Sequence, residues 1–157
     1  MTTLNEAEQK LARYLAKRRY EANRESGTPN KKVGPQSDED TDLNGIGAEI
    51  AFCKMLNVYP DTDLNTRPIA DALTKDGISC DVKCTKYQNG HLLAVDWKKD
   101  MSPDAYVLMV GEFPSYRCAG WIAANDLFAL PQKDMGYGPT YAAPQSELRP
   151  LNDTLLI

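Results

Sequence analysis

The segment Ile69–Tyr87 constrains the fold of this 157-residue chain more than any other. It predicts two strands, 69–74 and 78–85, joined by the tight turn Lys75-Asp76-Gly77. Because side chains alternate along a strand, Asp81 and Lys83 should share one face with Ser79 and Thr85. The opposite face should belong to the core and carries Ile78, Cys80, Val82 and Cys84.

The same segment gathers candidate catalytic side chains. Asp71 lies on the first strand, and Asp81 and Lys83 lie on the second. Two carboxylates beside a lysine are what a hard divalent cation and a water to be activated would need. Glu49 lies on a predicted helix over 44–57, among small residues that allow a close approach to the sheet. We therefore expect Glu49 to point inward.

Composition and charge set the protein class. The chain has no run of about eighteen apolar residues and begins with a polar segment, so we expect neither a membrane span nor a secretory signal, and a cytoplasmic location. The net charge of -4 argues against a uniformly basic coat for nucleic acid. The four cysteines are scattered, which predicts reduced thiols. Cys80 and Cys84 would lie about 13 Å apart on a strand, too far for one zinc ion.

An N-terminal helix is predicted over Thr3–Ser26, with Thr3 as N-cap and Glu6 at capping-box spacing. One helical stripe should dock and consists of Leu4, Ala7, Leu11, Leu15 and Ala22. A second stripe is basic and consists of Lys10, Arg13, Lys17 and Arg24. This basic stripe is either a solvated helix face or a contact for phosphates.

The rest of the chain predicts one domain with four parts: the N-terminal helix (1–26), a flexible loop with a solvated acidic cluster (27–43), a core (44–130) and a tail packed on the core (131–157). Asn89-Gly90 predicts a hairpin, so that 92–95 should return antiparallel to the preceding strand. A continuous apolar run over 104–111 indicates an interior strand. A further strand over 116–122 and a short helix over 124–130 should follow.

The order of these elements resembles the PD-(D/E)xK nuclease superfamily, with its restriction-endonuclease-like fold. The resemblance covers Gly45 to Trp121 and includes Gly-x-x-Ala-Glu before Cys-Asp-Val-Lys, a pattern also similar to small nuclease-like proteins of bacteriophages. It implies an α/β (α+β) fold in which helices flank a mixed central sheet. The chain departs from the pattern where Ala70 precedes Asp71, whereas a literal Pro-Asp occurs at Pro60-Asp61. We prefer Asp71 as the counterpart because the turn pairs its strand with Asp81.

The resemblance implies a magnesium-dependent endonuclease that hydrolyses phosphodiester bonds in DNA, with manganese as a substitute. Asp71 and Asp81 would bind the metal, Glu49 would join them directly or through water, and Lys83 would be the catalytic lysine. Thr85 and Lys86 are expected to touch the nucleic acid, together with the basic stripe. If both strands of a duplex are cut, a homodimer would supply two sites.

The sequence lacks the residues that two other catalytic mechanisms require. The single histidine, His91, excludes a histidine pair, and no glycine-rich phosphate loop of the Walker type is present. Two alternatives to the nuclease remain. One is a catalytically inactive module that binds nucleic acid or protein, in which the acids and the lysine are an ordinary ion pair. The other is a regulatory protein that acts on a host partner.

Overall fold

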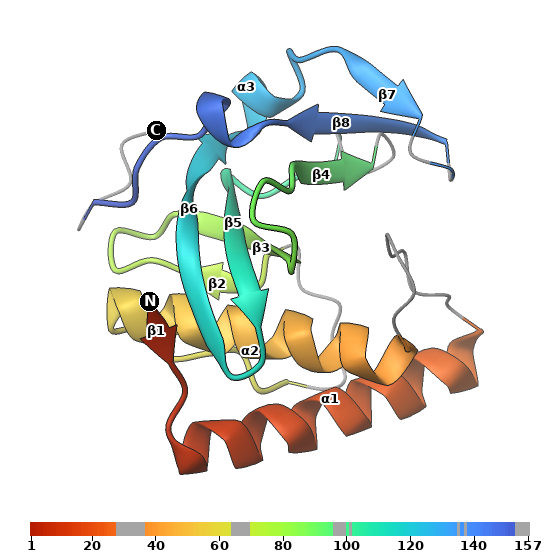
Figure 1. The fold of residues 1–157 in the computed structure, drawn as a ribbon, viewed down its shortest axis with the longest axis vertical. Coiled ribbons are helices and arrows are strands. Elements are labelled where there is room, and N and C mark those ends of the chain that lie inside the picture. The colour runs from red at the N-terminus through yellow and green to blue at the C-terminus, as the bar shows by residue number, and fades with distance from the viewer. Residues whose placement is uncertain are drawn as a thin grey trace.

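The computed structural model describes residues 1–27, 37–63, 70–95, 100, 102–134, 136 and 138–152. This part of the chain is a mixed α+β protein built in layers (Figure 1). Two long helices, α1 and α2, cover one side of a curled mixed sheet, and a small antiparallel sheet lies on the other side. None of the described helices combines the length and the hydrophobicity needed to cross a membrane.

Helix α1 (Glu6–Ser26) begins three residues later than the predicted start at Thr3. Its capping box is formed by Asn5 and Glu8, and Thr3 belongs to the short strand β1 (Thr2–Thr3). The docked side of the helix also differs from the predicted stripe. Ala7 and Ala22 are exposed, and the buried positions within the helix are Ala12, Leu15 and Ala16. The predicted stripe is confirmed at Leu4, Leu11 and Leu15, which are buried or pack against the first core, and is wrong at Ala7 and Ala22.

The predicted loop over 27–43 is wrong in its second half, because helix α2 (Asp38–Leu56) begins within it. Ser37 caps the helix by accepting a hydrogen bond from the Asp40 backbone amide at 3.0 Å. The acidic residues 38–40, expected in a solvated loop, form its first turn, where negative charge stabilises the helix dipole. Residues 28–36 of the predicted loop lie outside the described part. The helix ends at Asn57, which takes the left-handed conformation with φ 53°.

The larger sheet has the strand order β1, β6 (Ser115–Ala123), β5 (Ala105–Glu112), β3 (Ser79–Thr85) and β2 (Ala72–Leu73). The predicted pairing of Asp71's strand with the Asp81 strand is confirmed, since β2 runs antiparallel to β3. The predicted interior strand is β5, which is buried from Ala105 to Val110. Strands β3 and β5 are parallel, with Asp81 opposite Tyr106, and the Asp104 carboxylate fixes this register by accepting hydrogen bonds from Ser79.

The predicted hairpin after Asn89-Gly90 does not form. Strand β4 (Leu92–Val95) joins the smaller sheet beside β8 (Pro139–Ala143), which also pairs with β7 (Gln132–Asp134). Strand β5 pairs with β3 from Cys80 to Thr85, whereas β4 pairs along its whole length with β8, where Leu92 and Ala94 are buried in contact with the smaller sheet. Strands β7 and β8 also correct the prediction of a tail without strands after residue 131.

Two hydrophobic cores hold the layers together. The first lies between the helices and the larger sheet and contains Phe52, Cys80, Val82, Val107 and Met109. The second lies between the opposite face of that sheet and the smaller sheet, and contains Leu92, Tyr106, Leu108, Val110 and Tyr141. The short helix α3 (Ala124–Leu127) contributes Leu127 to the second core. The C-terminal part packs on the body, where Arg149 bridges to Trp121 after the 3-10 turn η2 (Gln145–Glu147).

Candidate active site

Asp71 is held at the edge of the larger sheet, just before the edge strand β2. Its backbone amide donates to the Cys80 carbonyl at 2.9 Å, and its Oδ2 accepts the Val82 amide at 2.7 Å. The carboxylate is therefore fixed against the backbone of β3. Asp61, the alternative to Asp71, instead accepts a local hydrogen bond from the Asp63 amide at 2.9 Å.

Asp81 and Lys83 share one face of β3, as the alternation predicted, and form an ion pair. Asp81 is buried, and the Lys83 side chain is 27% exposed. Burial alone would lower the pKa of Lys83, but the carboxylates of Asp81, Asp71 and Glu49 raise it above its ordinary value of 10.5. Lys83 is therefore an ammonium group at neutral pH. It can stabilise negative charge or orient a water, but it has no lone pair with which to deprotonate one.

Glu49 points inward from α2, as expected, with its side chain 15% exposed. The Arg19 guanidinium from α1 donates to its carboxylate at 3.1 Å and 3.4 Å. Burial and the nearby charge of Asp71 raise the pKa of Glu49 to about 8, although Arg19 opposes the shift. Glu49 is therefore mostly protonated at neutral pH in the absence of an added cation.

The acids interact electrostatically as one cluster. Burial and the charge of Asp81 raise the pKa of Asp71 to about 6, against the opposing effects of Lys83 and the Val82 amide. With every group ionised, the carboxylates of Glu49, Asp71 and Asp81 outnumber the cations Arg19 and Lys83 by one charge. Protonation of Glu49 removes this excess when no cation is bound, and a bound cation would favour the ionised form of Glu49.

The donor chemistry of the cluster suits magnesium better than zinc. Carboxylate oxygens are the protein ligands that magnesium prefers, and it commonly uses one or two of them while keeping several waters. Asp71 and Asp81 would supply such a pair. Within the described ranges, no group of three or more His, Cys, Asp or Glu side chains is arranged to hold a metal ion. Glu49 would thus join a metal only through water or after leaving Arg19.

The cysteines of β3 take no part in this site. Cys80 is a member of the first core and Cys84 packs against it, on the face opposite Asp81 and Lys83. Burial raises the pKa of each thiol to about 12, so both are neutral.

Two further residues belong to the site but were not predicted. Arg19 follows Leu15 and Ala16 at helical spacing, so the docked side of α1 already pointed to it. Tyr106 lies opposite Asp81, and its ring centroid is 5.9 Å from Lys83 Nζ. The Tyr106 hydroxyl is buried without a hydrogen-bond partner among the described residues. The apolar sequence of β5 could not identify Tyr106 as a site residue. Tyr106 lies beside Asp81 only because β3 and β5 pair in this parallel register.

The predicted nucleic-acid contacts are divided between two regions. On α1, Lys10 pairs with Glu6, Arg24 pairs with Asp38, the Arg13 guanidinium lies 4.8 Å from the Phe113 ring centroid, and Lys17 is exposed. Thr85 and Lys86 lie instead at the C-terminal end of β3. The site carboxylates and Lys83 interact as one cluster, whereas the predicted nucleic-acid contacts lie on two separate elements, α1 and the end of β3.

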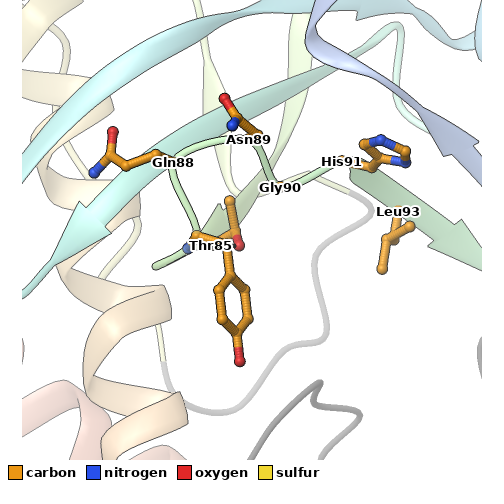
Figure 2. Close-up of a pocket in the computed structure, with 7 residues that line it drawn as sticks. Thr85, Gln88, Asn89, Gly90, His91 and Leu93 are labelled. Carbon is orange, nitrogen blue, oxygen red and sulfur yellow. Dashed lines mark hydrogen bonds between the residues drawn. The ribbon is translucent and has the colours of Figure 1, made fainter.

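A pocket of about 470 Å³ opens beside the C-terminal end of β3. Figure 2 shows Thr85 under the turn at Gly90, with His91 and Leu93 leading into β4. The pocket is lined by Thr85, residues 87–91 and Leu93. Thr85 lies two residues beyond Lys83 on the same strand face, so the pocket adjoins the candidate site.

Comparison of the chain with protein-family models, with curated proteins and with solved structures found no match.

Proposed function

We propose that this chain is a metal-dependent nuclease that hydrolyses phosphodiester bonds in DNA, and that its mixed sheet is a restriction-endonuclease-like core. One observation carries the proposal. Glu49, Asp71, Asp81 and Lys83 come from a helix, a sheet edge and a central strand, yet their side chains interact in one partly buried cluster. Such a cluster is costly to fold, because like charges repel and each loses water. A functional site explains why these charges are held together.

The residues have distinct proposed roles. Asp71 and Asp81 would hold magnesium, which when bound polarises the scissile phosphate and lowers the pKa of a coordinated water. Lys83, held as an ammonium group by the carboxylates, would stabilise the charge that develops on the phosphate or orient the water. Glu49 would complete the site through water. Its neutral form, favoured by burial and by the charge of Asp71, limits repulsion when the metal is absent, although Arg19 favours the charged form.

The test is nicking of supercoiled plasmid DNA in the presence of Mg²⁺ or Mn²⁺. The wild-type protein should nick the plasmid, and a chelator should abolish the reaction. Asp81→Asn and Lys83→Met should each lower the rate by about 100-fold or more, since each removes a group that stabilises charge in the reaction.

The matched control is Asp126→Asn, which alters an exposed carboxylate paired with Arg149. Its nicking rate should equal that of the wild type. Circular dichroism should show that all variants are folded. A folded Asp81→Asn protein that nicks at the wild-type rate would contradict the proposal.

A second candidate is a module with this architecture that binds nucleic acid without cutting it. The observation that favours it is the internal pairing of Lys83 with Asp81 and of Arg19 with Glu49, which balances much of the cluster without a metal. Under this alternative, calorimetry should detect no Mg²⁺ binding, whereas DNA binding should persist.

A further inference from the structure

The turn that lines the pocket beside β3 is fixed by hydrogen bonds from distant parts of the chain. The Gln145 side-chain amide donates to the Gln88 carbonyl at 2.8 Å and to the Gly90 carbonyl at 3.0 Å. Arg117 also donates to the Gln88 carbonyl, at 2.9 Å. The Gly90 amide closes the turn by donating to the Tyr87 carbonyl at 2.9 Å. The pocket is therefore formed before any ligand arrives, which reduces the entropy lost on binding.

Gly90 allows the turn to lie directly on β3. A Cβ atom at this position would lie 2.6 Å from Thr85 Oγ1 and 2.7 Å from its Cγ2, closer than real contacts permit. Thr85 Oγ1 also accepts the Tyr87 amide at 3.2 Å. These contacts hold the Tyr87 backbone next to the end of the strand that carries Lys83.

The side chains around the pocket suit a flat aromatic ligand with polar edges. Tyr87 is 45% exposed, so part of its ring is accessible to a ligand. Its ring lies 5.6 Å from Lys86 Nζ, so a cation is available for a phosphate beside the ring. Asn89 and His91 are exposed and offer hydrogen-bonding groups, and Leu93 adds an apolar contact. The volume of about 470 Å³ is in the usual range for small-ligand sites.

The pocket lies next to the cluster of carboxylates along β3. Thr85 is two residues from Lys83 along an extended strand, a distance of about 7 Å. Stacked nucleotides rise about 3.4 Å each along one strand, so a base in the pocket would lie one or two nucleotides from a phosphate at Lys83. A base inside a duplex has both faces covered by its neighbours, whereas an unpaired base can lay a face on a tyrosine without loss of base pairing.

We infer that the pocket formed by Thr85, residues 87–91 and Leu93 is a subsite for an unpaired nucleobase of DNA, with Tyr87 as its stacking platform. This inference rests on the proposed function for the identity of the ligand as DNA. It makes single-stranded or branched DNA, and not plain duplex, the substrate class of the neighbouring site.

Binding measurements without metal test the subsite separately from cleavage. The probes are a fluorescein-labelled oligothymidine of 12 nucleotides and a blunt duplex of the same length, and the readout is fluorescence anisotropy. In an Asp81→Asn background, Tyr87→Ala should weaken binding of the oligothymidine by about 10-fold, because it removes one base-stacking contact. Binding of the duplex should change by less than about twofold, and Tyr87→Phe should retain the affinity for oligothymidine.

Tyr59→Ala is the matched control, since Tyr59 is 82% exposed and lies outside the pocket. Equal oligothymidine affinities for Tyr87→Ala and Tyr59→Ala would overturn the subsite, whether or not the wild type nicks plasmid DNA. A loss specific to Tyr87→Ala would support the subsite even if the wild type proves unable to cut, in which case only the proposed catalysis would fail.

Discussion

At the scale of single residues, the site is defined by how its charges are balanced. Glu49 and Arg19 are partners from two helices, and Asp81 and Lys83 are partners on one strand. Asp71 is stabilised by the Val82 amide, a fixed dipole that costs no further reorganisation when charge changes nearby. The raised pKa values of Glu49 and Asp71 show that this balance is incomplete. Binding of a cation or a proton should complete the charge balance of the cluster.

The pH dependence of stability should reveal Glu49 directly. Its pKa is raised from 4.5 to about 8, so the folded protein binds more protons than the unfolded chain in this range. The free energy of unfolding should therefore fall as pH rises from about 4.5 to 8, and the contribution should be fully lost above 8. In Glu49→Gln this part of the slope, at most about 1.4 kcal/mol per pH unit, should disappear.

Urea unfolding at several pH values in metal-free buffer measures this effect. Glu6→Gln is the control, because the Glu6 side chain is 85% exposed. The wild type and Glu6→Gln should show the same slope, and Glu49→Gln a shallower one. If Glu49→Gln follows the wild-type slope, Glu49 ionises like a surface acid and its burial in the cluster is contradicted.

The sequence predicted more of this cluster than of its surroundings. Strand alternation separates Asp81 and Lys83 from the core cysteines, and small residues beside Glu49 indicate an inward position. Arg19 could have been found by continuing the docked side of α1 one turn past Leu15. Tyr106 could not, because which strand lies beside β3, and in which register, depends on long-range pairing.

At the scale of elements, α2 lies close to the larger sheet because its middle turns carry small side chains. Gly47 faces Tyr116 on β6, whose buried hydroxyl would lie 2.3 Å from a Cβ at position 47. Gly45, two positions earlier on the same helix, has no atom within 4 Å of such a Cβ. Asn44, one residue before Gly45, connects this part of α2 to the β5–β6 turn by accepting a hydrogen bond from the Phe113 amide at 2.8 Å. These contacts set the spacing between the helix layer and the sheet.

The two glycines provide a matched pair of substitutions. Gly47→Ala should lower the free energy of unfolding by about 1–3 kcal/mol, because the added methyl group forces Tyr116 or the helix to move. Gly45→Ala should raise it by about 0.5–1 kcal/mol, since alanine favours the helix and finds open space. Thermal and urea unfolding of both variants measure the effect. Equal effects of the two substitutions would show that α2 does not approach β6 at Gly47.

Local sequence patterns predicted most helices and strands but, apart from the β2–β3 pair, not which strands lie beside one another. The apolar run of β5 and the turn before β3 were sufficient to predict those strands. Strand β4 was also predicted, but its hairpin was not formed, since Leu92 and Ala94 are buried against β8 in the second core. Strand β8 is flanked by glycine and proline, which masked the apolar segment Tyr141–Ala143 that packs there.

At the scale of the whole molecule, charge is unevenly distributed. The chain carries a net charge of -4, yet α1 contains more basic than acidic residues. Lys10 and Lys17 are both exposed on this helix, and Lys10 is paired only with the exposed Glu6 among the described residues. Surface pairs of this kind contribute little to stability, so Lys10 is readily available to a phosphate. Helix α1 also holds Arg19 against Glu49, which connects this basic surface to the candidate site.

If α1 contacts the DNA backbone, the salt dependence of DNA binding should show the contribution of each lysine that contacts a phosphate. Lys10→Ala and Lys17→Ala should each weaken DNA binding and reduce the slope of log affinity against log salt by about 1, because each contact releases one condensed counterion. The measurement is anisotropy between 50 and 200 mM salt in the Asp81→Asn background. Lys133→Ala, on β7 in the smaller sheet, is the control and should leave the slope unchanged. Slopes that match this control in both variants would mean that the basic stripe of α1 is only a solvated helix face, and that DNA reaches the cluster from the side of β3 alone.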